Sequence, residues 1–226
     1  MGFPTRILKS LGIETKVELP GVGENLIEQP NLILAYSGDL EPSSSAYHTF
    51  ATATDLFGSD VAAVKASTLA SLSKWAQAAV DASGSDALNI TAIEKLLHIQ
   101  HDLLFKQNVT AAEVLTVVAP QGLLASNYWI LLPFSRGSVH LGSADKINEP
   151  LIDPRFFLAD FDLNATVVTG KLAQSFWLSE PMNTVVTGPL IPGPNVLPND
   201  ATDAQWEAYV REYREFSFRS VACIGG

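Results

Sequence analysis

The chain has 226 residues, enough for one large domain or two small ones with a hydrophobic core. An apolar fraction of 47% with 17% charged residues excludes general disorder. The formal net charge of −10, with no cluster of Lys and Arg, argues against nucleic acid or an anionic membrane as a partner. The single cysteine, Cys223, excludes an internal disulfide framework.

The first half of the chain predicts mostly helices, because apolar residues recur at helical spacing in two long segments. The predicted elements are a helix over residues 4–12 that stops at Gly12, a strand over 32–36, a polar loop over 37–45, and amphipathic helices over about 61–84 and 89–107. On the last of these helices we expect the buried side to carry Ile93, Leu96, Leu97, Leu103 and Leu104.

The second half of the chain predicts strands followed by helices. The expected elements are strands over residues 114–118, 128–132 and 138–141, with turns at Gly122 and Gly137, and helices over 164–178 and 203–215. Prolines at four positions between residues 188 and 198 predict a loop there. Because strands and helices follow no regular alternation, the fold class is predicted to be α+β.

Residues 19–26, LPGVGENL, are the most distinctive segment. Taken alone they form a tight connector, and Leu26 stands where a dinucleotide-binding fingerprint needs its third glycine. LGI precedes this segment, WILLPFSRGSVHL begins at Trp129, and IDPRFF begins at Ile152. Together these segments resemble the flavin-dependent glucose-methanol-choline (GMC) oxidoreductases, and most closely the glucose oxidase and glucose dehydrogenase branch. The sequence departs from the family after Leu26, where IEQP replaces QDHP.

The resemblance implies a substrate-binding domain made of an antiparallel sheet backed by helices, with only the edges of a Rossmann-type FAD domain. Residues 1–30 are expected to be a remnant of the FAD-binding domain and its connector, 31–216 the substrate-binding domain, and 217–226 the truncated start of the C-terminal catalytic and FAD segment. FAD is then the cofactor of a longer parent, and most of its site is expected to lie outside this chain.

Site residues follow from the same resemblance. Trp129 takes the place of a tryptophan that lines the sugar pocket, and Arg219 that of an arginine that binds the sugar. Val221 and Cys223 stand where the family has a substrate-binding Asn and the His that acts as general base. Valine cannot bond a hydroxyl, and a thiol needs a lowered pKa for which the sequence shows no activator. Either the catalytic base is lost, or the tail sequence is altered by a shifted splice junction. Cys223 itself is expected to be a buried, inert thiol rather than the base.

The expected function is therefore that of part of an FAD-dependent oxidoreductase that acts on the CH–OH group of an alcohol or aldose. The isolated chain is expected to be inactive and not to retain flavin. A non-catalytic glycoprotein fragment or a pseudoenzyme of the same family is the alternative. A metal-dependent hydrolase built on His98 and His101 is disfavoured, because no second helix offers matching ligands and a solvated face explains both residues.

Three sequons, at Asn89, Asn108 and Asn164, favour a secreted glycoprotein. The N-terminus has no apolar signal core, and no apolar run is long enough to span a bilayer. The expected partner is a small-molecule alcohol or sugar, with neither nucleic acid nor membrane, and the parent is a candidate homodimer.

Overall fold

A computed structural model describes residues 5–83, 87–145 and 149–221, with side chains up to residue 214. The chain divides into two compact units. Unit 1 comprises Met1–Glu28, Ala63–Lys106 and Pro133–Asp162, and unit 2 comprises Gln29–Ala62, Gln107–Leu132 and Leu163–Gly226.

Unit 1 is built around two long helices. Its described elements are α1 (Thr5–Ser10), most of α3 (Val61–Ser83), α4 (Ile90–Phe105), β5 (Ser138–Leu141) and β6 (Pro150–Asp153). Asn89 starts α4 as its N-cap by accepting a hydrogen bond from the backbone N–H of Ala92. In the core, Trp75 of α3 packs on Phe134 with ring centroids 5.3 Å apart, and Phe134 meets Phe161 edge-on at 5.2 Å.

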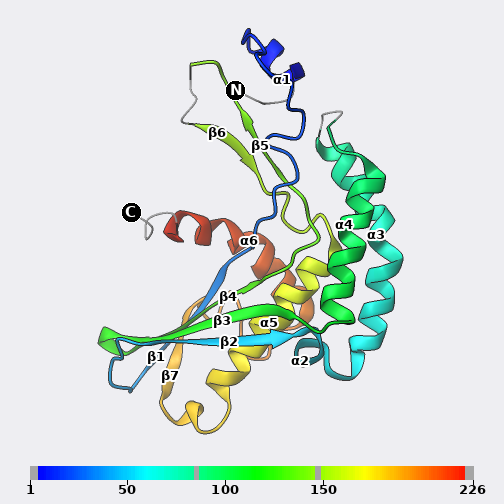
Figure 1. Cartoon of the computed structure of the whole chain (residues 1–226). Helices are drawn as coiled ribbons and strands as arrows, with labels where there is room; N and C mark the ends of the chain where they lie inside the picture. Colours follow the sequence, from blue (N-terminus) through cyan, green and yellow to red (C-terminus); the bar gives the residue numbers. More distant parts are fainter. Residues whose placement is uncertain (1–4, 84–86, 146–148, 222–226) are drawn as a thin grey trace. The chain divides into compact units, whose positions relative to one another are not determined.

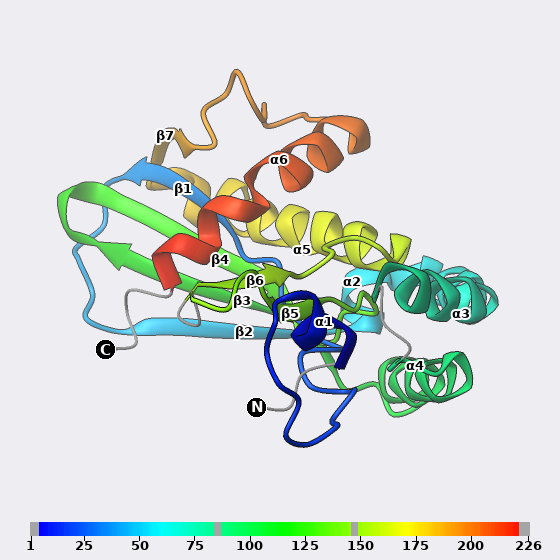
Figure 2. The ribbon, with the colours of Figure 1, turned by 90° about the horizontal axis from the view of Figure 1, so that it is seen from above.

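Unit 2 contains a five-stranded antiparallel sheet, whose strands lie side by side in Figures 1 and 2. The spatial order is β2 (Ala46–Thr52), β3 (Thr110–Ala119), β4 (Leu123–Ile130), β1 (Leu32–Gly38) and β7 (Val186–Ile191). β3 and β4 form a hairpin closed by the short 3-10 turn η2 (Pro120–Gly122), where Gln121 and Gly122 have φ of 66° and 71°. β2 and β7 are the two edges of the sheet.

Helix α5 (Asp160–Leu178) covers the face of this sheet that carries Ser126 and Tyr128. The helices of unit 2 are α2 (Ala53–Phe57), most of α5 and α6 (Asp203–Val221), with the 3-10 turns η1 (Gly58–Asp60) and η3 (Met182–Thr184). On α5, the buried Trp177 donates its Nε1–H to Ser126 Oγ of β4 at 2.9 Å. A Cβ at Gly170 would lie 2.6 Å from Trp206 of α6 and 2.7 Å from Tyr128 Oη, so glycine lets α5 approach both.

The sheet backed by helices confirms the predicted α+β class. The strand over 138–141 and the stop of α1 before Gly12, whose φ is 70°, agree with the sequence-based prediction. The loop expected over residues 188–198 is wrong at its start, because β7 runs to Ile191. Leu96 is also misassigned, since it is 44% exposed while Leu97 is fully buried. β2, α2 and β6 were not predicted.

Candidate functional site

Three sequence motifs far apart in the chain meet in unit 1, at what we call the motif junction (residues 23–26, 137–141 and 150–155). β5 pairs with β6 in antiparallel register. On the connector, Leu26 and Gly137 exchange both backbone hydrogen bonds, at 2.9 and 2.8 Å. The N–H of Val139 donates to the carbonyl of Gly23 at 2.7 Å. The LPGVGENL segment is therefore anchored to the backbone of β5.

Two glycines make this close approach possible. Gly23 has a φ of 82°, and a Cβ there would lie 2.1 Å from the carbonyl oxygen of Val139. A Cβ at Gly137 would lie 2.2 Å from the carbonyl oxygen of Asp153. The glycines of two separate motifs are thus explained by one packing arrangement, in which backbone meets backbone without room for a side chain.

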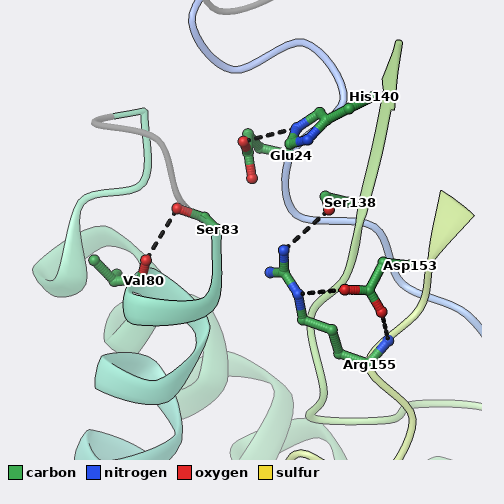
Figure 3. A network of polar contacts seen from close by, with 7 residues as sticks. All are labelled: Glu24, Val80, Ser83, Ser138, His140, Asp153 and Arg155. Carbon is green, nitrogen blue, oxygen red and sulfur yellow. Dashed lines mark hydrogen bonds and ion pairs between the residues drawn. The ribbon is translucent and has the colours of Figure 1, made fainter. Parts of the chain in front are cut away.

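Polar side chains hold the motif junction together, as Figure 3 shows. His140 Nε2 lies 3.0 Å from Glu24 Oε1, and only 1% of the Glu24 side chain is exposed. Arg155 donates its Nε–H to Asp153 Oδ2 at 3.2 Å and an Nη2–H to Ser138 Oγ at 3.0 Å. These contacts join the LPGVGENL segment to β5, and β5 to the residues that follow β6.

The LLPFSRG motif owes its shape to a buried carboxylate. The two oxygens of Asp162 accept the backbone N–H groups of Phe134 and Ser135, each at 2.7 Å. Burial raises the pKa of Asp162 to about 6, against the lowering effect of its hydrogen bonds to Ser135 and Phe134 and of the Arg136 charge. Asp162 therefore stabilises the turn through which β4 leads to β5.

Arg136 of the same motif is a structural residue. It is 2% exposed and donates to the carbonyls of Pro133 and Ser135 at 2.8 Å and to Gln100 Oε1 at 2.7 Å. Desolvation lowers the pKa of Arg136, opposed by the charge of Asp162. Because its guanidinium donates to these three acceptors, Arg136 holds the motif against α4.

Unit 2 presents a second polar and aromatic group of side chains, on the face of the sheet opposite Ser126 and Tyr128. Alternation along the strands and the pairing register place its members on one side. We call this surface the Trp129 face, and its residues are Ile33, His48, Phe50, Glu113, Leu115, Asn127 and Trp129. All of them are half-buried or exposed, whereas Val114, Ser126 and Tyr128 on the covered face are buried.

The Trp129 face combines aromatic rings with hydrogen-bonding groups. Trp129 lies directly opposite Glu113, and Glu113 lies directly opposite Phe50. His48 Nδ1 is 2.6 Å from Glu113 Oε1, and its ring stacks on Phe50 with centroids 6.3 Å apart and planes 18° apart. Aromatic faces beside a carboxylate and an imidazole can hold a ligand that has both C–H-rich faces and hydroxyl groups.

The structure places the other predicted site residues as follows. Trp129 is half-buried on the sheet. Arg219 lies in α6 beyond the last described side chain, and Cys223 lies outside the described residues. The sequon residues Asn89, Asn108 and Asn164 are all exposed.

Sequence reasoning missed His48 and Asp162 as candidates. His48 lies in β2, a strand that the sequence did not predict. Its partner is 65 residues away, so only the cross-strand register brings the two together. For Asp162, the available signal was one of two aspartates, Asp160 and Asp162, in the first turn of α5.

No metal or membrane site emerges from the residues that the structure describes. His98 is exposed, but His101 is 1% exposed and bonds the carbonyl of Lys65 at 3.1 Å, so the expected solvated face is wrong for His101. Among residues 5–83, 87–145 and 149–221, no three His, Cys, Asp or Glu side chains are grouped to hold a metal. Within the same ranges no helix combines the length and apolarity needed to cross a membrane.

The described residues do not fit FAD on their own. In a dinucleotide fold, glycines of the G-x-G type leave room for the pyrophosphate. Here the space next to Gly23 holds the carbonyl oxygen of Val139 at 2.1 Å from a Cβ position. The G-x-G of residues 21–23 therefore lets the chain pack on itself.

Comparisons with known proteins agree with this architecture. Residues 133–225 match the family profile described as GMC oxidoreductase. Over 201 residues the chain is 53% identical to the glucose oxidase-like protein fsoC of Humicola fuscoatra. This match covers 89% of the chain and 34% of fsoC. It is 32% identical over 206 residues to a glucose oxidase of Penicillium chrysogenum, covering 90% of this chain and 33% of the relative. The chain thus spans about a third of the length of these relatives.

The fold has a counterpart among solved structures. An FAD-dependent oxidoreductase from Chaetomium thermophilum superposes with a TM-score of 0.72 at 20% identity, over 93% of this chain and 40% of the other. The motif junction accounts physically for the segments on which the resemblance depends. The chain belongs to the GMC oxidoreductase family.

Proposed function

We propose that this chain supplies the substrate-binding side of an FAD-dependent oxidoreductase that acts on CH–OH donors, an alcohol or an aldose. The Trp129 face carries the proposal, because it places an indole beside a carboxylate on a surface that is half-buried or exposed. The relatives named glucose oxidase and glucose oxidase-like support an aldose as the donor. Trp129 would lie against the C–H-rich face of the donor, and Arg219 would bind one of its hydroxyl groups.

FAD is the proposed cofactor of the complete protein, where it would accept the hydride of the donor. The support comes from the family and not from the described residues, whose glycine turn is filled by their own backbone. We therefore also propose that the isolated chain binds no flavin and is inactive by itself.

A non-catalytic role within the same family is the second candidate. Its support is the sequence of the tail, where Val221 and Cys223 stand at the positions of the family's Asn and His. The exposed sequons at Asn89, Asn108 and Asn164 support a secreted glycoprotein under either proposal. Cys223 would act as the general base only if catalysis by the active protein depends on the Cys223 thiolate. Homodimerisation of the parent stays a prediction.

The kinetics of a Trp129→Ala variant test the first proposal. In the complete protein, the Trp129→Ala substitution should lower kcat/KM for D-glucose at least about tenfold, which corresponds to about 1.4 kcal/mol of transition-state binding. Tyr47→Ala is the matched control, because it removes an aromatic side chain from the opposite face of β2, where Tyr47 is 58% exposed. Equal kinetics of the Trp129→Ala and Tyr47→Ala variants would remove Trp129 from the substrate site.

A further inference from the structure

His48 and Glu113 form a short hydrogen-bonded pair on the Trp129 face. The Nδ1 of His48 lies 2.6 Å from Oε1 of Glu113, whose side chain is 14% exposed against 50% for His48. A carboxylate only accepts hydrogen bonds, so Nδ1 carries the proton of this contact. In the neutral ring Nε2 is then left with its lone pair and can accept a hydrogen bond.

The pair lies among the aromatic residues of the same surface. Phe50 stacks on the His48 ring, and Trp129 is the direct cross-strand neighbour of Glu113. Side chains directly opposite in an antiparallel sheet have Cβ atoms about 4.5–5.5 Å apart. A small ligand against the Trp129 indole would therefore lie within reach of the His48–Glu113 pair.

Other charges near β2 are already engaged. From β3, Glu113 is the titratable group that faces His48. From α2, Asp55 bonds the backbone N–H and the hydroxyl of Thr52, and these hydrogen bonds lower the pKa of Asp55. Glu113 is therefore the charged group that contacts the His48 ring.

We propose that His48, oriented by Glu113, is a substrate-contacting residue whose Nε2 accepts a hydrogen bond from a hydroxyl group of a polyhydroxylated ligand lying against Trp129. The inference rests on the proposed function, because it takes this ligand to be the CH–OH donor. It adds a specificity-determining residue that the family motifs do not contain. A ligand without a hydroxyl at this position would leave the imidazole acceptor unpaired and would bind more weakly.

Binding of D-glucose to the full 226-residue chain tests this role by NMR. The imidazole nitrogen shifts of His48 and the indole signal of Trp129 should move together and saturate with D-glucose. His48→Phe and Glu113→Ala should each weaken binding about three- to tenfold, the effect of losing one hydrogen bond to the ligand. Thr49→Ala, an exposed polar residue on the opposite face of β2, should bind like the wild type.

A pH series separates ligand contact from a structural role. Protonation of Nε2 removes its lone pair, so D-glucose binding should be weaker in acid than at neutral pH, and this difference should be absent in His48→Phe. Should His48→Phe fail to fold by circular dichroism, Glu113→Ala carries the test.

Three results would overturn the inference: no D-glucose binding by the wild type, unshifted His48 signals at saturation, or wild-type affinity in both variants. If Trp129→Ala loses D-glucose while His48→Phe does not, the inference fails and the proposed function survives. If binding depends on His48 but the complete protein oxidises no donor, the proposed function fails instead.

Discussion

Replacing Asp162 by Asn is expected to change how the stability of the chain depends on pH. The two carboxylate oxygens of Asp162 accept the N–H groups of Phe134 and Ser135, each at 2.7 Å, in a site that is 1% exposed. An Asn side chain offers only one acceptor oxygen, so one backbone N–H would face an amide NH₂. Leaving a buried donor unsatisfied costs about 1–3 kcal/mol.

The carboxylate itself carries an opposing cost that the Asn variant lacks. Burial raises the pKa of Asp162 from 3.8 to about 6, so the folded chain binds this proton more tightly than the unfolded chain does. The stability that comes from protonation is fully present below about pH 3.8 and is lost as the pH rises through about 6. A shift of about two pKa units corresponds to about 3 kcal/mol.

Urea unfolding at about pH 4 and about pH 7.5, on either side of that pKa, measures the difference. Near pH 4 Asp162 is protonated, but its hydroxyl oxygen can still accept from a backbone N–H, which an amide NH₂ cannot. The Asp162→Asn variant should therefore be less stable than the wild type by about 1–3 kcal/mol at this pH. Near pH 7.5 the gap should close or reverse, because only the wild type then carries a buried negative charge at position 162. Asp160→Asn is the control, since Asp160 is in the same helical turn but is exposed and paired with Lys74. An equal gap between Asp162→Asn and wild type at both pH values would refute the reasoning.

Three further outcomes are expected. Gly23→Ala should lower the free energy of unfolding by about 2–4 kcal/mol, because of the positive φ at Gly23 and the clash of the new Cβ with Val139. Gly21→Ala is the control, since a Cβ at Gly21 has no atom within 4 Å, and equal unfolding midpoints of the two variants would contradict this account. Tyr209→Phe should cost about 1 kcal/mol, because the Tyr209 hydroxyl donates to the Ile33 carbonyl at 2.6 Å, whereas Tyr47→Phe should be neutral in the same urea titration. The purified chain should elute from gel filtration without visible flavin absorbance, and co-eluting flavin would show that the glycine turn was misinterpreted.

The elements that sequence could predict are those with a strong periodic pattern. The long helices α3 and α4 and the strand β5 were found in this way. β2 was missed because five of its seven residues are exposed, so it lacks the apolar alternation of a half-buried strand. Residues 188–191 of β7 were assigned to a loop because four prolines lie between residues 188 and 198, but an edge strand tolerates Pro189.

The candidate site was predictable only where a motif marked it. Trp129 could be named from the resemblance, and the structure adds that it faces the same side as Glu113. His48 could not be found, because its pairing with Glu113 depends on the register between β2 and β3. The role of Gly23 was also hidden, since its constraint comes from Val139, more than a hundred residues along the chain.

Anaerobic mixing of the complete protein with donors tests the central claim most directly. The proposed function predicts that D-glucose or a simple alcohol bleaches the absorbance of bound flavin, and that Trp129→Ala slows this reduction while Tyr47→Ala does not. A complete protein that holds flavin and is reduced by no CH–OH donor would contradict the account. Reduction at the same rate in the wild type and in Trp129→Ala would contradict the role of the Trp129 face.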